Sequence, residues 1–227
     1  MSARDAILGR IRAAVGDEGR RGDEVAPIER DYRHRWDASR DEIVTRFAQR
    51  LHDYGVTVVR LERAEQIAEA AERQLHARRI ARLVAPDDLP AAWRPDRPAV
   101  VHDKALSHRE LNEIEGVMTG CALGIAETGS IVLDAGQAQG RRRLTLLPDY
   151  HLCVVFTDQI VGLLPEAIAQ LHAAGTAGAP ITFISGPSAT ADIELSRVQG
   201  VHGPRTLDVL LVGVPARPSR FAADASA

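Results

Sequence analysis

The apolar residues of this chain follow two different spacings, which predict helices and strands in alternation. Ile43, Val44, Phe47 and Leu51 fall on one face of a helix and Gly55 ends the run, so residues 41–55 should form an amphipathic helix. The β-branched segment VTVVRL that follows predicts a strand. By the same criteria, helices are predicted at 63–78, after Ser107 and at 165–175, and strands at 79–85, 99–101, 117–125, 131–133, 152–156, 181–185 and 207–214. Apolar strands separated by such helices are typical of an α/β domain with a mostly parallel sheet flanked by helices.

The first 35 residues carry a different pattern. Ile7, Leu8 and Ile11 are spaced as in a short amphipathic helix that stops at Gly16, and a stretch rich in glycine and charged residues follows. We therefore expect an N-terminal helical arm and linker over residues 1–35 and one domain over residues 36–227.

Composition and charge limit the classes of function. The chain has 227 residues, 45% of them hydrophobic, and a net charge of -3, as in an ordinary globular protein. A nearly neutral chain gives no reason to expect nucleic acid as a partner. No segment has the ~20 consecutive apolar residues of a membrane span, and the N-terminus lacks the apolar core of a secretory signal. We expect a cytoplasmic protein.

Three predicted loops concentrate glycine, hydroxyl and charged residues, and they lie at residues 124–130, 134–143 and 185–194. Ligands of open α/β sheets gather beyond the carboxyl ends of the strands, where such loops lie. The second loop contains neither the Walker phosphate motif nor the dinucleotide fingerprint. We therefore expect the three loops to form a cleft for a small anion, either a carboxylate or a phosphate-bearing molecule.

The first loop carries Glu127, Thr128 and Gly129. A carboxylate beside a tight turn can act as a nucleophile or a base, and it can equally hydrogen-bond the turn itself. Thr128 suits either a ligand donor or a turn former, whereas Gly129 suits a backbone conformation that other residues avoid.

The second loop ends in Gly140, Arg141, Arg142 and Arg143, and it supplies backbone donors and positive charge. In an extended segment the three arginines cannot all point the same way, so one or two could hold a carboxylate or phosphate while the others are solvated. His151 follows soon afterwards, with Asp149 beside it, as an acid-imidazole pair or a structural hydrogen bond.

The third loop offers Ser185, Gly186 and Ser188 as an anion cradle before a possible helix that starts near Thr190. His202 lies further on in a loop flanked by glycines, where a functional role and a structural one are equally open. The histidines lack H-x-x-x-H spacing, so no intrinsic zinc is expected. Two cysteines without a C-x-x-C motif cannot complete a four-cysteine cluster site, so any iron-sulfur chemistry must be carried by a partner.

Two long segments resemble one known family. The segments AETGSIVLDAGQAQGRRRLTLLPDYHLCVV and FISGPSATADIELSRVQGVHGPRTLDVLLV are similar to the LUD domain, specifically to the lactate-utilisation protein C group of bacteria. The resemblance covers about Arg35 to Val214, and five motifs occur in the order of the family: E-T-G, Q-G-R-R, P-D-Y-H, G-P-S-x-T-x-D-I-E and G-V-H-G-P. In combination these motifs are specific, although each alone is weak.

The resemblance implies a fold like that of ribose-phosphate isomerase, glucosamine-phosphate deaminase and the CoA-transferases. It also implies a role in the oxidation of L-lactate to pyruvate, with no cofactor in this chain and with iron-sulfur clusters in two partner proteins. In the related CoA-transferases a glutamate followed shortly by glycine attacks a thioester, and Glu127 matches that pattern. Two hypotheses follow: a non-redox subunit of a lactate-oxidising complex, or a self-sufficient CoA-transferase-like or cyclo-ligase-like enzyme that uses Glu127.

Overall fold

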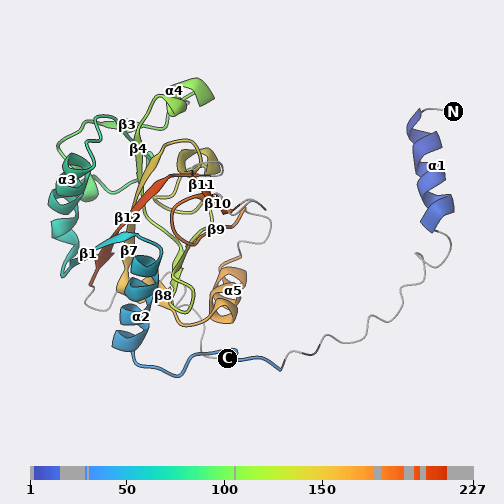
Figure 1. Cartoon of the computed structure of the whole chain (residues 1–227), viewed down its shortest axis with the longest axis horizontal. Coiled ribbons are helices and arrows are strands. Elements are labelled where there is room, and N and C mark those ends of the chain that lie inside the picture. Colours follow the sequence, from blue (N-terminus) through green and yellow to red (C-terminus); the bar gives the residue numbers. More distant parts are fainter. Residues whose placement is uncertain are drawn as a thin grey trace. The chain divides into compact units, whose positions relative to one another are not determined.

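The computed structural model describes residues 3–15, 29, 31–104, 106–175, 180–191, 197–199 and 203–213. It divides the chain into two units, Met1–Arg33 and His34–Ala227. The first unit contains helix α1 (Ala3–Val15; Figure 1). This helix exposes 58% of Ile7 and 52% of Ile11.

The second unit is built around a six-stranded sheet in which all pairs of neighbouring strands are parallel. The strand order is β1-β12-β7-β4-β2-β3. The neighbouring strands β7 and β12 are apolar over most of their length, and every residue of β7 is buried. The strands are β1 (Thr57–Leu61), β2 (Leu83–Ala85), β3 (Val100–His102), β4 (Gly116–Thr119), β7 (Tyr150–Phe156) and β12 (Thr206–Val212). The predicted α/β class and mostly parallel sheet are confirmed.

Helices cover both faces of this sheet because successive side chains of a strand point to opposite sides (Figure 1). Leu152 and Val154 of β7 pack in one core with helix α3 (Ile67–Ala77). Cys153 and Val155, the alternate residues, pack in a second core with helix α2 (Arg40–Asp53). The remaining helical segments are η2 (Ala64–Gln66), η3 (Ala91–Trp93), α4 (His108–Asn112), η4 (Arg142–Thr145), η5 (Thr157–Gln159) and α5 (Leu164–Ala173).

A smaller, mixed sheet lies beside the main one, and its strand order is β8-β5-β6-β9. Strands β5 and β6 form an antiparallel hairpin, β9 pairs with β6, and β8 runs parallel to β5. The strands are β5 (Leu123–Ile125), β6 (Ser130–Leu133), β8 (Ile160–Val161) and β9 (Thr182–Ile184). The single strand predicted over residues 117–125 is therefore wrong. Residues 116–126 are buried throughout, so their apolar pattern does not reveal that the chain leaves one sheet and enters another.

The helix expected from Thr190 is also wrong. Residues Ala189–Ala191 form strand β10, which pairs with β11 (Arg197–Gln199) in an antiparallel ribbon. Pairing across the ribbon supplies the backbone partners that a helix would otherwise provide. The anion cradle expected at this loop therefore cannot depend on a helix N-terminus.

A buried carboxylate holds the centre of the main sheet to helix α3. Asp208 of β12 is 0% exposed, and it accepts hydrogen bonds from Arg78 Nε at 2.9 Å and Arg78 Nη2 at 2.7 Å. The hydroxyl of Tyr150 on β7 donates to the same carboxylate at 3.0 Å. The carboxylate raises the pKa of Arg78, and burial together with Asp208 raises the pKa of Tyr150 well above its usual range. Side chains from β7, from β12 and from the C-terminal end of α3 therefore meet at the Asp208 carboxylate.

We predict that Asp208→Asn lowers the free energy of unfolding by about 3 kcal/mol, because it leaves the Arg78 guanidinium without its buried partner. Asp149→Asn is the matched control, since Asp149 and Arg205 form an ion pair whose side chains are 67% and 57% exposed. That change should cost less than about 1 kcal/mol. Urea denaturation of both variants measures the difference, and equal losses would contradict the assigned role of Asp208.

Candidate functional site

A cavity of about 250 Å³ lies at the amino-terminal ends of the neighbouring strands β7 and β12. His151 of β7 and Leu207 at the start of β12 form its base, and Arg142 and Thr145 of η4 form one side. Residues 182–188, together with Gly203 and Pro204, form the other side. The sequence analysis placed the ligand beyond the carboxyl ends of the strands, whereas this cavity borders the opposite ends of β7 and β12. It nonetheless brings together the second and third of the three predicted loops.

His151 is the most deeply buried polar residue at the cavity. The side chain is 0% exposed, and Nε2 lies 2.8 Å from Oγ1 of Thr119 on the neighbouring strand β4. The other ring nitrogen, Nδ1, is buried without a hydrogen-bond partner among the described residues. A buried nitrogen of this kind costs free energy unless a ligand or water satisfies it. It therefore marks a position at which a bound molecule is expected.

A line of polar groups continues from His151 beneath the cavity. Oγ1 of Thr119 lies 4.0 Å from Sγ of Cys153, which lies 3.7 Å from the carbonyl oxygen of Gly120. Cys121 is also buried, and the Cys153 thiol and burial raise the pKa of Cys121 well above its usual range. The neighbouring side chains of Cys121, His151 and Thr119 lower the pKa of Cys153. Sequence analysis missed Thr119, because no local motif marks a residue that acts across two strands.

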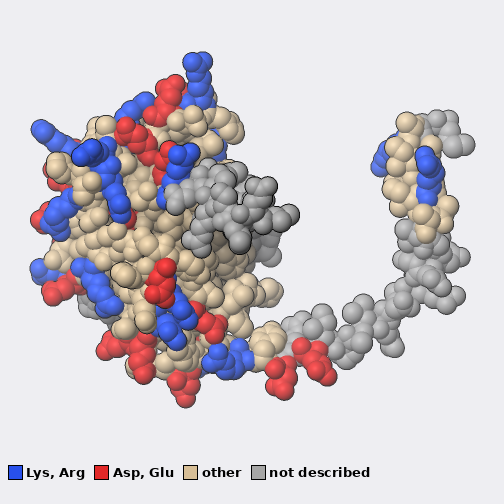
Figure 2. Space-filling model, viewed as in Figure 1, with Lys and Arg blue, Asp and Glu red and all other residues tan. Residues whose placement is uncertain are grey.

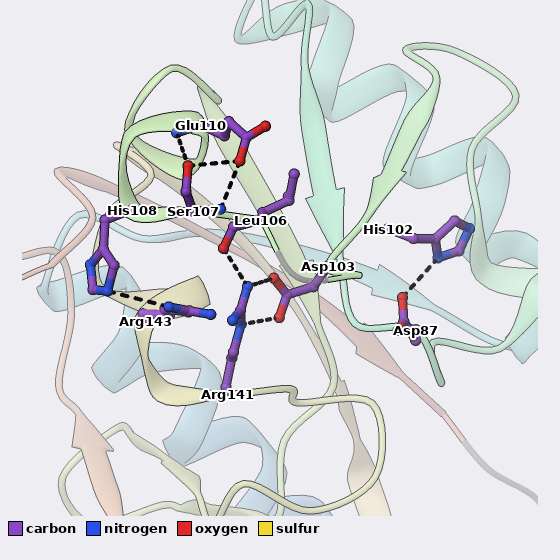
Figure 3. Close-up of polar contacts among 9 residues, drawn as sticks. All are labelled: Asp87, His102, Asp103, Leu106, Ser107, His108, Glu110, Arg141 and Arg143. Atoms are coloured by element: carbon purple, nitrogen blue, oxygen red, sulfur yellow. Dashed lines mark hydrogen bonds and ion pairs between the residues drawn. The ribbon is translucent and has the colours of Figure 1, made fainter.

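The three consecutive arginines point to three different places, because residues 142–145 form a 3₁₀ turn and not the extended segment considered above. A 3₁₀ helix has three residues per turn, so successive side chains point about 120° apart around its axis. Arg141 forms a bidentate ion pair with Asp103 and donates to the carbonyl of Leu106 at 2.9 Å, as Figure 3 shows. Arg143 reaches His108 instead, at 3.2 Å (Figure 3).

Arg142 is the arginine that borders the cavity. The residue is exposed, and its Nη1 donates to Oγ1 of Thr145 at 3.2 Å, which also orients that hydroxyl at the cavity wall. The described part of the chain shows no ion pair between Arg142 and a carboxylate, so its charge is available to an anionic ligand. Of the three arginines, Arg142 alone thus combines charge with a place at the cavity.

The third predicted loop supplies hydroxyl groups to the same space. Ser185 and Ser188 border the cavity, and the backbone N–H of Ser188 donates to the carbonyl of Pro204 at 2.8 Å. Oγ of Ser185 lies 2.6 Å from Oγ of Ser130, which lies 2.8 Å from Oγ1 of Thr128. Thr128 therefore reaches the cavity only through two other hydroxyl groups.

Gly186 and Gly129 have backbone conformations that favour glycine, and both approach the C-terminal part of helix α2 closely. Gly186 has φ +88°, and a Cβ there would lie 2.8 Å from Cβ of Tyr54. Gly129 has φ +65° in the β5–β6 turn, and a Cβ there would lie 2.6 Å from Cβ of Arg50. Both positions combine a left-handed backbone with a close approach, which only glycine satisfies without strain. Gly140 likewise has a positive φ, and it does not line the cavity.

Glu127 does not line the cavity. It is an exposed residue of the β5–β6 turn, where its N–H donates to the carbonyl of Gly162 at 3.0 Å. Its own carbonyl accepts a hydrogen bond from Nε of Arg50 at 3.2 Å. The backbone contacts fit the turn-forming alternative for this segment. His202 and the side chain of Thr190 lie outside the described residues.

The rest of the described chain contains little that suggests other chemistry. Within these residues, no three His, Cys, Asp or Glu side chains are arranged to hold a metal ion. None of the described helices combines the length and apolar character needed to cross a membrane. Figure 2 shows basic and acidic side chains interspersed over the visible face, without a large region of one sign.

Comparisons with known proteins agree on one family. The model of the LUD domain matches residues 44–212. A Lactate utilization protein C from Deinococcus radiodurans is 46% identical over 77% of this chain and 82% of its own length. A protein of the same name from Geobacillus thermodenitrificans is 28% identical over 92% of this chain and 95% of its own. The crystal structure of a DUF162 family protein from D. radiodurans has a TM-score of 0.67 and 39% identity, and the match covers 78% of this chain and 99% of that one.

We predict that Arg141→Ala and Arg142→Ala separate stability from anion binding. Arg141→Ala should cost about 2 kcal/mol, because it leaves the Asp103 carboxylate, which is 10% exposed, without its bidentate partner. Arg142→Ala should change stability by less than about 1 kcal/mol. Acetate or phosphate should raise the melting temperature of the wild type and of Arg141→Ala but not of Arg142→Ala. An unchanged response in Arg142→Ala would rule out this arginine as the anion ligand.

Proposed function

This chain belongs to the LUD domain family, and from that premise we propose that it is a component of a bacterial L-lactate utilisation system. In this system it supports the oxidation of L-lactate to pyruvate together with iron-sulfur partner proteins. Relatives that carry the name Lactate utilization protein C support the assignment to lactate utilisation. The cavity, which combines the Arg142 guanidinium with an unsatisfied nitrogen of His151, supports a small carboxylate as the ligand.

Each polar group of a small hydroxy acid has a matching side chain at the cavity. A guanidinium binds a carboxylate through two parallel hydrogen bonds, and Arg142 supplies one at the side of the cavity. The hydroxyl groups of Thr145, Ser185 and Ser188 can donate to or accept from the remaining oxygen atoms. His151 provides a further contact at the base. Charge at one side and neutral polar groups elsewhere would orient the ligand within the cavity.

The electrons of the reaction require partner proteins. Conversion of L-lactate to pyruvate releases two electrons and two protons. The chain has two cysteines, and both Cys121 and Cys153 are buried in the core, so they do not supply the four thiolates of a cluster. In this proposal the partners' iron-sulfur clusters accept the electrons, while this chain holds the small anion. The exposed Ile7 and Ile11 of α1 offer one apolar surface for docking such a partner.

The purified chain should not reduce a dye with L-lactate as the electron donor, and reduction should begin when the two iron-sulfur partners are added. Omission of this chain should lower the rate. Arg142→Gln should lower it as well, because the carboxylate loses its charged partner, whereas Arg109→Gln is the control at a side chain that is 92% exposed. Dye reduction by the chain alone, or a full rate without it, would contradict the proposal.

A second experiment addresses the alternative enzyme of the CoA-transferase or cyclo-ligase kind. Glu127→Gln keeps the size of the side chain and removes its charge, so a turn residue should tolerate it and a nucleophile or base should not. Because Glu127 lies outside the lining of the cavity, we expect at least about half of the wild-type rate in the reconstituted system. A drop of 100-fold or more with unchanged melting temperature would favour the alternative.

A further inference from the structure

We propose that Thr119 is a positioning residue that fixes the tautomer of His151, so that the imidazole presents an unprotonated Nδ1 to the ligand. The group of the ligand that meets His151 is then a hydrogen-bond donor, such as the hydroxyl of a 2-hydroxy acid. This inference rests on the proposed function in one respect, namely that the cavity holds a small carboxylate. The tautomer itself follows from the contacts beneath the cavity and can be tested without any ligand.

Which group donates in each of these hydrogen bonds follows from the contact furthest from His151, between Cys153 and the carbonyl of Gly120. The carbonyl oxygen of Gly120 can only accept, so the Cys153 thiol, with Sγ 3.7 Å away, is the donor in that contact. The sulfur is then available as an acceptor for the hydroxyl of Thr119 at 4.0 Å. A threonine hydroxyl has one proton, and once that proton points to sulfur, the oxygen can only accept from its other neighbour.

That other neighbour is Nε2 of His151, at 2.8 Å. Nε2 must therefore carry the proton, and in a neutral imidazole Nδ1 is then the unprotonated nitrogen. Ionisation of Cys153 leaves the direction unchanged, because a thiolate accepts even more strongly from the Thr119 hydroxyl. The same tautomer results with a thiol or a thiolate at position 153.

The sheet itself places these groups in line. Thr119 of β4 and Cys153 of β7 are directly paired in the parallel ladder. His151 precedes Cys153 by two residues, so both side chains leave the same face of β7. His151, Thr119 and Cys153 are each 0% exposed, which shields their contacts from competing water. A hydrogen bond to the far nitrogen is a common way in which proteins fix the orientation and tautomer of a functional histidine.

The tautomer determines which ligands the cavity accepts best. An unprotonated Nδ1 accepts a hydrogen bond from the hydroxyl of a 2-hydroxy acid. The ketone oxygen of the matching 2-oxo acid has only lone pairs, and it would face another lone pair. An acid without a substituent at this carbon leaves Nδ1 unsatisfied. We expect L-lactate to bind about 3- to 10-fold more tightly than pyruvate or propionate, which is the range for one neutral hydrogen bond.

The test compares the full-length wild type with Thr119→Val and Thr119→Ser. Valine keeps the volume of threonine and removes the hydroxyl, whereas serine keeps the hydroxyl and serves as the matched control. Calorimetry with L-lactate, pyruvate and propionate should show the preference for lactate in the wild type and in Thr119→Ser. In Thr119→Val the affinities for lactate and pyruvate should become equal within about twofold, because the ring is free to change tautomer.

Nitrogen NMR of protein labelled in histidine reads the tautomer directly, with a His151→Asn variant to assign the signals. The wild type and Thr119→Ser should give the pattern of protonated Nε2 and unprotonated Nδ1 near neutral pH, and Thr119→Val should give a mixture. Protonated Nδ1 in the wild type, or an unchanged pattern in a folded Thr119→Val, would overturn the role of Thr119. If none of the three acids binds, the proposed ligand of the cavity and the hydroxyl preference both fail, while NMR still decides the tautomer.

Discussion

The buried charge of Asp208 is the constraint on which the centre of this molecule depends. A carboxylate inside a sheet is costly unless every one of its partners is in place, and here Arg78 and Tyr150 must both reach it. Those contacts hold β7 and β12 in register on the face that packs against α3. The same register pairs Leu207 with His151 on the opposite face, where both border the cavity. A structural contact on one side of the sheet thus sets the geometry of the candidate site on the other.

Much of the fold could be predicted from the sequence, because its strongest patterns arise from burial. The helix at 41–55 and the strand at 207–214 have apolar residues at clear spacings, and both match elements of the structure within a few residues. The second sheet could not be predicted in this way. The run from β4 to β5 is buried throughout, and a uniform apolar pattern carries no information about which sheet a residue joins.

The candidate site was harder to predict, because it forms from segments that are distant along the chain. Arg142, Ser185, Gly186 and Ser188 were selected from loop composition, and the structure places them around one cavity with His151. Composition could not distinguish Arg142 from Arg141, since that difference depends on where Asp103 lies in space. Glu127 was selected beside a glycine that turns a hairpin, a local pattern shared by many structural turns. Thr119 has no local signal, because its relation to His151 exists only once β4 and β7 are paired.

The alternation of side chains along β7 and β12 also affects how the chain can misfold. A slip of one residue in β12 would carry its side chains to the wrong face. The carboxylate of Asp208 would then enter the apolar core beneath α2, far from Arg78, and a buried charge without a partner is strongly unfavourable. Mispaired sheets are therefore much higher in energy than the native one. The same side chain that stabilises the native sheet therefore disfavours a sheet in which β12 is out of register.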